Sequence, residues 1–478
     1  MIRPDADTIG WLWNVLRPDL VVIVGTPLAL LATLHALLNK RDVPAAIGWI
    51  ALAWLAPILG PALYSLFGIS RVSRRAREVR QEVRADGAAA PPPPAAAPDG
   101  LDALRRAVGT LTGMPLTEGN AFAVLRNGDA AYPAMLGAIE GAGTSVVLTT
   151  YILRPDRVGT QFIEALARAR GRGVAVRVLV DGIGSGYFLP GAYGRLRRRG
   201  VPVARFMHSG LPWRMPFLNL RSHKKLLVVD GSEAFLGGLN IGDEDVLSRR
   251  PREPVRDTHF RVEGPVVAQL AGDFARDWFF ATGEALPEQA APGPREAGRA
   301  QARAVASGPD EDIEKIEFAV LQACACARRT IHLMTPYFLP DDVLVTALAM
   351  ASMRGVAVDV LLPARSNHRL VDWASRAHVG PLLDRGVRLW QVPPPFDHSK
   401  LLVVDEVWSL IGSANMDARS LRLNFELDVE VYETELAAAL VASMRGLMHR
   451  RLDAATLRRR PSLARLRDAA ARLALPYL

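Results

Sequence analysis

Two long uncharged stretches dominate the start of the chain. Residues 20–39 and 43–70 contain no Asp, Glu, Lys or Arg. Each is long enough for a helix that crosses the hydrocarbon layer of a membrane, which takes about 20 residues. A buried helical hairpin in a soluble core would share this pattern, but Trp11, Trp13 and Trp49 lie near the ends of the stretches, where membrane proteins place tryptophan. The pattern therefore predicts a two-helix transmembrane hairpin. A cleaved signal peptide is not expected, because the chain does not open with a basic segment, a short apolar run and a small-residue cleavage site.

The rest of the chain has the periodicity of a layered α/β protein. In each half a β-rich segment is followed by an amphipathic helical segment, which a glycine ends before a second strand. These segments are 144–151, 162–170 and 174–180 in the first half, and 330–337, 343–353 and 356–362 in the second. Strand, helix and strand at this spacing predict an α/β sheet that is covered on its faces.

The two halves also repeat each other in sequence. HKKLLVVD at 223–230 and HSKLLVVD at 398–405 differ at one position. RGVAV precedes each of them, at 172–176 and at 354–358, and a second RGV follows at 199–201 and 385–387. The repeat predicts a duplicated structural unit.

Segments without periodicity separate these parts. GAAAPPPPAAAPDG at 87–100 has enough proline to be a semi-rigid spacer, and 288–308, rich in Ala, Pro, Gly, Glu and Arg, has the composition of a second linker. The expected organisation is a membrane hairpin and basic juxtamembrane segment at 1–86, the spacer at 87–100, a first domain at 101–287, a linker at 288–308, and a second domain with a basic carboxyl-terminal segment at 309–478.

Composition excludes several classes of protein. The chain has 478 residues, of which 50% are hydrophobic, so it is too apolar to be disordered. Its two cysteines, Cys324 and Cys326, are too close in sequence for an ordinary disulfide. A disulfide framework and a thiolate-rich zinc site are therefore excluded, and small buried thiols are expected.

The net charge of +9 is concentrated in two places. Basic residues flank the hairpin mainly on its outer sides, which places both termini in the cytoplasm. The outer residues are Arg3, Arg17, Arg71, Arg74, Arg75, Arg77, Arg80 and Arg84, against Lys40 and Arg41 in the turn. Residues 445–472 hold nine arginines and two aspartates. We expect contact with anionic lipid, with a solvated helical face as the alternative for the carboxyl-terminal cluster. No nucleic acid is expected as a partner, because aromatic residues for base stacking are not interleaved.

Each repeat places histidine, lysine and aspartate at one fixed spacing, followed by asparagine ten residues after the aspartate. The candidate catalytic residues are His223, Lys225, Asp230, His398, Lys400 and Asp405, and the candidate phosphate-binding residues are Asn240 and Asn415. Alternation along a strand puts each histidine and its lysine on one face. A neutral imidazole attacks phosphorus and a protonated one donates to the departing alkoxide, while lysines and amides neutralise the phosphate oxygens. The pattern predicts phosphodiester exchange, which in this form needs no metal or cofactor.

The doubled His-x-Lys-x4-Asp pattern, followed by Gly-Gly or Gly-Ser and Asn, resembles the phospholipase D superfamily over residues 120–455. Within it the chain is similar to the bacterial cardiolipin synthases, on its two amino-terminal segments, its carboxyl-terminal ARLRDAAARLALPYL and several motifs. These motifs are Asp181-Gly-Ile-Gly-Ser185, Asn240-Ile-Gly-Asp-Glu244, Arg256-Asp-Thr-His259, Asp277-Trp278, Asn415-Met-Asp417, Arg419-Ser420 and Asn424-Phe-Glu426. The chain departs from the family at Val255, where tryptophan is usual, and at Asn367, where aspartate is common; neither departure touches the proposed reacting groups.

The resemblance implies two pseudo-twofold-related phospholipase D-like αβα sandwich domains whose motifs meet in one site. It implies that one histidine becomes covalently phosphatidylated, with His223 as nucleophile and His398 as acid and then base. Glu426, 28 residues after His398, resembles the family's histidine-orienting carboxylate, and Asp257 is the expected counterpart in the first half. Asp230 and Asp405 are expected to have structural roles, bonding backbone or lysine around a turn.

The resulting hypothesis is a membrane-anchored cardiolipin synthase that joins two phosphatidylglycerol molecules, in the bacterial inner membrane with its catalytic domains facing the cytoplasm. A phospholipase D or another phosphatidyltransferase, such as a phosphatidylserine synthase, would use the same residues. A membrane-tethered nuclease would share the half-sites, and a non-catalytic scaffold is disfavoured because both motifs are intact. The motifs leave open whether phosphatidylethanolamine is a substrate, and they carry no information on oligomeric state.

Other conspicuous residues have plainer interpretations. Gly182, Gly184 and Gly186 lack the spacing of a nucleotide site and predict a tight loop at the cleft. His332 and His368 could be ligands, but we interpret them as surface histidines.

Overall fold

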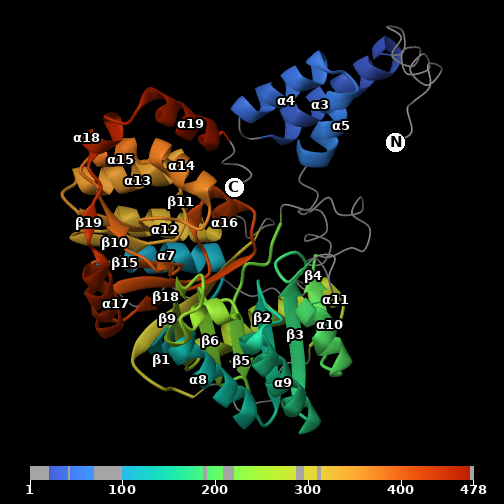
Figure 1. Cartoon of the computed structure of the whole chain (residues 1–478), viewed down its shortest axis with the longest axis vertical. Helices are drawn as coiled ribbons and strands as arrows, with labels where there is room; N and C mark the ends of the chain where they lie inside the picture. The colour runs from blue at the N-terminus through green and yellow to red at the C-terminus, as the bar shows by residue number, and fades with distance from the viewer. Residues whose placement is uncertain are drawn as a thin grey trace. The chain divides into compact units, whose positions relative to one another are not determined.

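The computed structural model describes residues 21–40, 43–68, 100–186, 191–207, 220–286, 295–308 and 314–473 (Figure 1). They belong to two compact units, a short helical unit and an α/β unit that contains the described residues from 100 onward. Each unit is described by itself. The basic cluster at 71–84 and the spacer at 87–100, apart from Gly100, lie outside the described residues.

Among the residues of the helical unit that the structure describes, one helix is long enough to cross a membrane. A π-helical turn at Val21–Gly25 continues into α3 (Thr26–Asn39), and together they give an apolar helix over Val22–Asn39. The second uncharged stretch is divided into α4 (Val43–Leu55), α5 (Leu59–Leu63) and a π-helical turn at Tyr64–Gly68. Pro57 lies in the break, where its missing N–H cannot continue the helix. The expected second spanning helix is therefore not a single continuous helix.

Small side chains lie between these helices. Ala29, Ala36 and Ala53 are buried together with Tyr64, whose hydroxyl lies 2.8 Å from Nδ1 of His35. Small residues allow helices to approach closely, as they do in membranes. The outward positions are apolar, and Leu38 is 83% exposed.

The α/β unit is built on one continuous sheet of 15 strands. The first half contributes β1 (Thr117–Arg126), β2 (Ser145–Thr150), β3 (Ala175–Asp181), β4 (Val203–Phe206), β5 (Leu226–Val229), β6 (Glu233–Gly237) and β8 (Thr258–Glu263). The second half contributes β9 (Ala300–Ser307), β10 (Thr330–Met334), β12 (Ala357–Pro363), β13 (Arg388–Val392), β15 (Leu401–Val404), β16 (Trp408–Gly412), β18 (Glu426–Tyr432) and β19 (Arg450–Arg451).

The strand order confirms the duplication. From the centre outward, one half runs β1-β8-β6-β5-β2-β3-β4 and the other β9-β18-β16-β15-β10-β12-β13, with β19 at the far edge. The two series meet where β1 pairs with β9 antiparallel. β5 and β15, which lie within the two histidine motifs, take equivalent places in this order. The expected parallel pairs are present as β2 with β3 and β10 with β12.

Helices cover both faces of each half. One face of the first half carries α8 (Asn127–Gly141), α9 (Arg157–Gly171) and α10 (Gly191–Arg198), and α11 (Val266–Thr282) packs on the strands as well. The second half carries α12 (Lys315–Cys326), α13 (Asp342–Met353), α15 (Gly380–Asp384) and α17 (Thr434–Leu447). On β5, Leu227 and Val229 join the core under α8 and α9, whereas the alternating Leu226 and Val228 do not. Alternation thus gives each strand two apolar faces, as a covered sheet requires.

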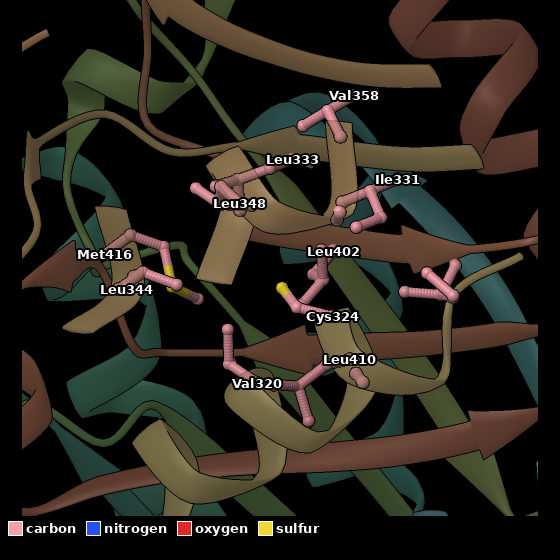
Figure 2. Close-up of a cluster of buried hydrophobic side chains, with 14 of the residues drawn as sticks. Val320, Cys324, Ile331, Leu333, Leu344, Leu348, Val358, Leu402, Leu410 and Met416 are labelled. Atoms are coloured by element: carbon pink, nitrogen blue, oxygen red, sulfur yellow. The ribbon is translucent and has the colours of Figure 1, made fainter. Parts of the chain in front are cut away.

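Figure 2 shows the core of the second half, where side chains of α12 and α13 pack against the sheet. Val320 and Cys324 from α12 and Leu344 and Leu348 from α13 lie around Leu402 of β15. The expectation of buried thiols is confirmed for Cys324, and burial raises the pKa of its thiol to about 12. Cys326 is half-buried.

The expected linker at 288–308 is contradicted at its end. Residues 300–307 form β9, which pairs with both β1 and β18. The alanine-rich composition concealed a central strand that is buried on both faces, with Ala302, Ala304 and Val305 among its buried residues. In addition, α7 (Asp102–Thr112), at the start of the expected first domain, packs on α12 in the core of the second half.

Shorter elements complete the α/β unit. They are two 3-10 turns at Asp243–Asp245 and Leu247–Arg249, β7 (Val255–Arg256), β11 (Phe338–Leu339), β14 (Phe396–Asp397), β17 (Met416–Asp417), α14 (Arg369–His378), α16 (Ala418–Arg422), α18 (Ala454–Arg458) and α19 (Ser462–Arg472). β7 pairs with β14, and β11 with β17.

Candidate active site

The two histidine motifs open onto one cavity of about 1360 Å³. His223 and Asn240 from the first half and His398 and Asn415 from the second half line it together. Both histidines precede equivalent strands: β5 lies between β6 and β2, and β15 lies between β16 and β10. The duplicated sequence therefore supplies one site with two histidines.

Backbone pairing between the halves brings the motifs together. Phe396 and Asp397 in β14 pair with Val255 and Arg256 in β7, and the N–H of His398 donates to the carbonyl of Arg256 at 2.7 Å. On the other side, the N–H of His223 donates to the carbonyl of Phe425 at 2.8 Å. Each histidine is thus fixed to the segment of the other half that carries a carboxylate one residue further on.

The carboxylates consequently pair across the halves. Nδ1 of His223 lies 3.0 Å from each carboxylate oxygen of Glu426, and Nδ1 of His398 lies 2.8 Å from Oδ2 of Asp257. The sequence indicated both carboxylates without assigning them to a histidine, and in the structure each contacts the histidine of the other half. Spacing along the chain could not reveal this pairing, because it arises from the strand pairing between the halves.

Further hydrogen bonds hold both carboxylates. Glu426 accepts from the Ser413 hydroxyl at 2.6 Å and from the Asn424 amide at 3.0 Å, and Asp257 accepts from the N–H of Thr258 at 2.7 Å. Burial by itself would raise the pKa of each carboxyl, but nearby cationic groups outweigh burial and hold both pKa values below the usual ones. Both groups are therefore ionised at neutral pH and suited to hold a proton on Nδ1 of their histidine.

The histidines themselves are neutral at neutral pH. Burial, joined by the positive charges of Lys225 and Lys400, lowers the pKa of His223 and of His398 to about 4. Each lysine affects the histidine of the other motif as well as its own, as expected for motifs that converge. With Nδ1 beside a carboxylate, Nε2 is the nitrogen of each ring that is left for a substrate.

The motif lysines are buried beside the histidines. Nζ of Lys225 donates to the carbonyl of His223 at 2.5 Å, and Nζ of Lys400 to that of His398 at 2.5 Å. Nζ of Lys400 also lies 2.9 Å from Nδ1 of His398. Burial, with the repulsion of one lysine by the other, lowers the pKa of Lys225 to about 7, and burial lowers that of Lys400 to about 8. The cost of burying these charges falls if an anion joins them.

The two asparagines line this cavity at equivalent places. Oδ1 of Asn240 and Oδ1 of Asn415 are buried and have no hydrogen-bond partner among the described residues. A buried amide oxygen without a partner is costly, and an amide that turns by half a rotation presents Nδ2, which can donate to a phosphate oxygen.

The motif aspartates lie at the opposite ends of β5 and β15 from the histidines. Asp230 accepts from the N–H groups of Gly143, Thr144 and Ser145 at 2.7–2.9 Å. Asp405 accepts in the same way from the N–H groups of residues 328–330 at 2.7–2.9 Å. Asp230 thus ties the turn after β5 to the start of the neighbouring strand β2, and Asp405 ties the turn after β15 to the start of β10. Neither aspartate lines the cavity that the histidines share.

The structure adds residues that the sequence did not identify. Tyr151 packs edge-on against His223 with ring centroids 5.0 Å apart, and Tyr337 against His398 at 6.1 Å. Each is the last residue of a predicted strand, and this position is the only signal in the sequence that could have found them. Arg221 and Arg419 also line the cavity.

One of the two histidines interpreted as surface residues is buried. His332 lies in β10, with Nδ1 3.4 Å from a carboxylate oxygen of Asp359, because its strand lies inside the sheet. His368 is exposed, as interpreted, and also lines the cavity. The loop expected at Gly182–Gly186 is present next to it, tied by Asp181, which accepts from the N–H groups of Ile183 and Gly184.

Comparison with known proteins agrees with this geometry. The family model described as "Cardiolipin synthase, PLD-like domain" matches residues 135–278 and 320–448. The chain is 38% identical to cardiolipin synthase A of Pseudomonas fluorescens, over 84% of this chain and 85% of that protein. It is 33% identical to a cardiolipin synthase of Geobacillus kaustophilus, over 92% of this chain and 90% of that protein.

A solved structure has a similar fold. The phosphatidylserine synthase of Haemophilus influenzae superposes with a TM-score of 0.61, and the match covers 78% of this chain and all of that one. The sequences are 14% identical, so this likeness concerns the fold alone.

Proposed function

Because the chain belongs to the phospholipase D-like family of cardiolipin synthases, we propose that it moves a phosphatidyl group from one phosphatidylglycerol to another, giving cardiolipin and glycerol. The observation that carries this proposal is the pair of histidines, one from each repeat, with crossed carboxylates in one cavity. That arrangement supplies a nucleophile and a proton carrier for one phosphorus atom.

In the first step Nε2 of His223 attacks the donor phosphorus. An N–P bond forms, the bond from phosphorus to the glycerol headgroup oxygen breaks, and His398 gives its Nε2 proton to that oxygen. The donor phosphate is an anion, so its binding raises the pKa of His398 and allows the proton to be taken up beforehand. Glu426 balances the positive charge that develops on the phosphatidylated His223 ring.

In the second step the primary hydroxyl of a second phosphatidylglycerol gives its proton to His398. The hydroxyl oxygen bonds to phosphorus, the N–P bond breaks, and cardiolipin leaves. His398 again carries the proton with which the cycle began, and His223 is again neutral. One phosphodiester replaces another, so no nucleotide is consumed.

Lys225, Lys400, Asn240 and Asn415 are the proposed phosphate-binding groups. The two lysines are buried beside the histidines, and the two asparagines line the cavity, where Nδ2 of each amide would donate to a phosphate oxygen. These donors are in place before the reaction, so they stabilise the charge on the non-bridging oxygens without reorganising.

The contacts of Nδ1 favour His223 as the nucleophile. Nδ1 of His223 faces both oxygens of Glu426, which fixes the proton there and leaves the lone pair on Nε2. Nδ1 of His398 is shared between Asp257 and the ammonium group of Lys400. Its tautomer is less strictly fixed, which suits a ring that takes up and releases a proton in each cycle.

We propose that the helical unit anchors the protein in the bacterial inner membrane with the α/β unit in the cytoplasm. Its apolar outer positions and its small-residue core support insertion, and α4 and α5 together extend the second apolar segment over 43–63. The excess of basic residues outside the hairpin supports the orientation.

We further propose that the carboxyl-terminal helices rest on anionic lipid. On α19, Leu463 is 81% and Leu466 68% exposed, beside Arg465 and Arg472. α19 packs on α14, whose first residue, Arg369, lines the cavity. A surface of leucines and arginines next to the active-site cavity suits a protein that takes its substrates from a membrane.

The test uses the purified full chain with phosphatidylglycerol in mixed micelles that contain a chelator. Cardiolipin formed with an equal amount of glycerol is the expected result. Phosphatidic acid as the only lipid product would identify a phospholipase D. Phosphatidylserine formed from an activated lipid donor and serine, without cardiolipin from phosphatidylglycerol, would identify a different phosphatidyltransferase. Loss of all turnover in the chelator would contradict the two-histidine mechanism.

A further inference from the structure

Arg221 and Arg419 lie together in the cavity beside the proposed nucleophile. Arg221 precedes His223 by two residues, and Arg419 follows Asn415 by four. The charges of both arginines act on Tyr151, and the charge of Arg221 acts on Arg419. The Tyr151 ring in turn packs against His223. Two guanidinium groups from different halves are therefore gathered next to one reacting histidine.

The equivalent positions in the other half do not repeat this charge. Two residues before His398 stands Phe396, and four residues after Asn240 stands Glu244. Glu244 accepts from Nε of Arg154 at 2.5 Å, so the arginine there is already neutralised. The reacting groups are symmetric between the halves, whereas the arginines at these two positions are not repeated.

We propose that Arg221 and Arg419 bind the phosphodiester of the acceptor phosphatidylglycerol. This inference rests on the proposed function. The donor phosphate occupies the histidines, lysines and asparagines, and its departing glycerol is uncharged. The acceptor that takes the place of this glycerol carries a second phosphate, three carbons from the attacking hydroxyl. Guanidinium groups bind such oxygens through charge-assisted, often bidentate hydrogen bonds. The pair therefore selects an anionic acceptor over water and neutral alcohols.

The test compares two soluble acceptors with phosphatidylglycerol as donor. One is glycerophosphoglycerol, the headgroup of the lipid with its phosphodiester and without acyl chains, and the other is glycerol. Labelled acceptors report transfer, and phosphatidic acid reports hydrolysis by water. We expect the wild type to prefer glycerophosphoglycerol, and R221Q and R419Q each to lose about 10- to 100-fold in transfer to it, the range of one charge-assisted hydrogen bond. Transfer to glycerol and hydrolysis change less than threefold.

R252Q is the matched control, because Arg252 is an exposed arginine that lines the same cavity. It is expected to keep the preference of the wild type. R221K and R419K preserve the charge and should restore part of the preference if a glutamine variant folds poorly.

Each remaining outcome overturns the inference. Equal losses with both acceptors would show that the arginines serve the first step or the fold. An unchanged preference would show that they do not contact the acceptor. A loss of transfer in phosphatidylglycerol vesicles, with transfer to glycerophosphoglycerol unchanged, would show that the arginines bind the lipid surface and not the acceptor phosphodiester. A wild type that forms no cardiolipin would instead refute the proposed function, which is a separate result.

Discussion

At the scale of single residues, the site depends on how each histidine keeps a proton on Nδ1. Glu426 and Asp257 reach the histidines across the boundary between the halves, at 3.0 and 2.8 Å. A buried carboxylate in this position fixes the tautomer and stabilises the cationic ring, and its loss in related arrangements of acid, histidine and nucleophile costs several orders of magnitude in rate.

Because each carboxylate contacts the histidine of the other half, the structure predicts which carboxylate variant regains activity with a substrate that has a better leaving group. Phosphatidyl p-nitrophenol needs no proton on its leaving group, so the first step no longer needs His398 or Asp257. We expect E426Q and D257N each to lower kcat with phosphatidylglycerol by about 100- to 10,000-fold. With the activated ester, D257N regains a burst of p-nitrophenol and E426Q does not. Rescue of E426Q alone would show that each carboxylate serves the histidine of its own half.

The motif lysines predict how activity responds to pH. Burial lowers the pKa of Lys225 to about 7 and that of Lys400 to about 8, so both lose their positive charge as the pH rises through this window. An ordinary lysine would stay charged up to about pH 10. Measured under first-order conditions, kcat/KM should fall above pH 8, approaching about tenfold per pH unit. A value that stays constant to pH 10 would contradict this assignment.

At the scale of the elements, β5 and β15 carry the proposed catalytic residues at one end and a structural aspartate at the other. β5 and β15 have a histidine and a lysine before their first residue and an aspartate after their last. The three residues form one sequence motif because a single short strand separates the histidine and lysine from the aspartate. In the structure the aspartates hold the turn after that strand and lie away from the histidines. Asp230 has φ of 51° and Asp405 of 55°, a conformation that aspartate and asparagine adopt more easily than most residues.

Asp230→Asn tests this division. Asparagine keeps the backbone preference but replaces one carboxylate acceptor by a donor that faces N–H groups. The free energy of unfolding should fall by about 1–3 kcal/mol, while kcat per folded molecule changes little. Denaturant unfolding and the micelle assay measure the two quantities. Asp384→Asn, at an exposed ion pair with Arg458, is the control and should stay within about 0.5 kcal/mol of the wild type. A large loss of kcat in a stable Asp230→Asn protein would assign Asp230 a chemical role.

Much of the element structure follows from the sequence. The strands at β2, β3, β10 and β12 and the helices α9 and α13 lie where periodicity and terminal glycines placed them. β9 was not predicted because it is a central strand buried on both faces, which leaves no alternation, and its composition is rich in alanine. The crossed pairing of Glu426 and Asp257 was not predicted because strand pairing between distant segments leaves no local pattern in the sequence. The burial of His332 was not predicted for a related reason, since a polar residue on a buried strand is recognised only once its partner, Asp359, is known.

At the scale of the whole molecule, duplication gives a symmetric reaction centre inside an asymmetric cavity. The sheet runs without interruption through both halves and joins them where β1 pairs with β9. Exchange between two copies of one lipid suits such an arrangement, because donor and acceptor differ only in which part reacts.

The carboxyl-terminal surface predicts how the α/β unit meets lipid. Leu463→Glu/Leu466→Glu places two carboxylates on α19, where apolar contact and positive charge now coincide. The variant should convert phosphatidylglycerol in vesicles at least about fivefold more slowly and lose little activity in detergent micelles. Met353→Glu, at a residue that is 71% exposed on α13, is the matched control and should behave as wild type in both assays. Equal activity of the leucine variant in vesicles and micelles would contradict lipid contact by α19.

The central claim is that two histidines from the two repeats act on a single phosphorus atom. Its most direct test is rapid quenching with denaturant at mildly alkaline pH, where the N–P bond of histidine survives, during turnover of phosphatidylglycerol labelled on the phosphate, followed by digestion and peptide analysis at the same pH. We expect at most one phosphatidyl group per chain, bound to His223, absent from His223→Ala, and no turnover of phosphatidylglycerol by His398→Ala. Two labelled histidines in one chain, or full activity of either alanine variant, would contradict the shared site.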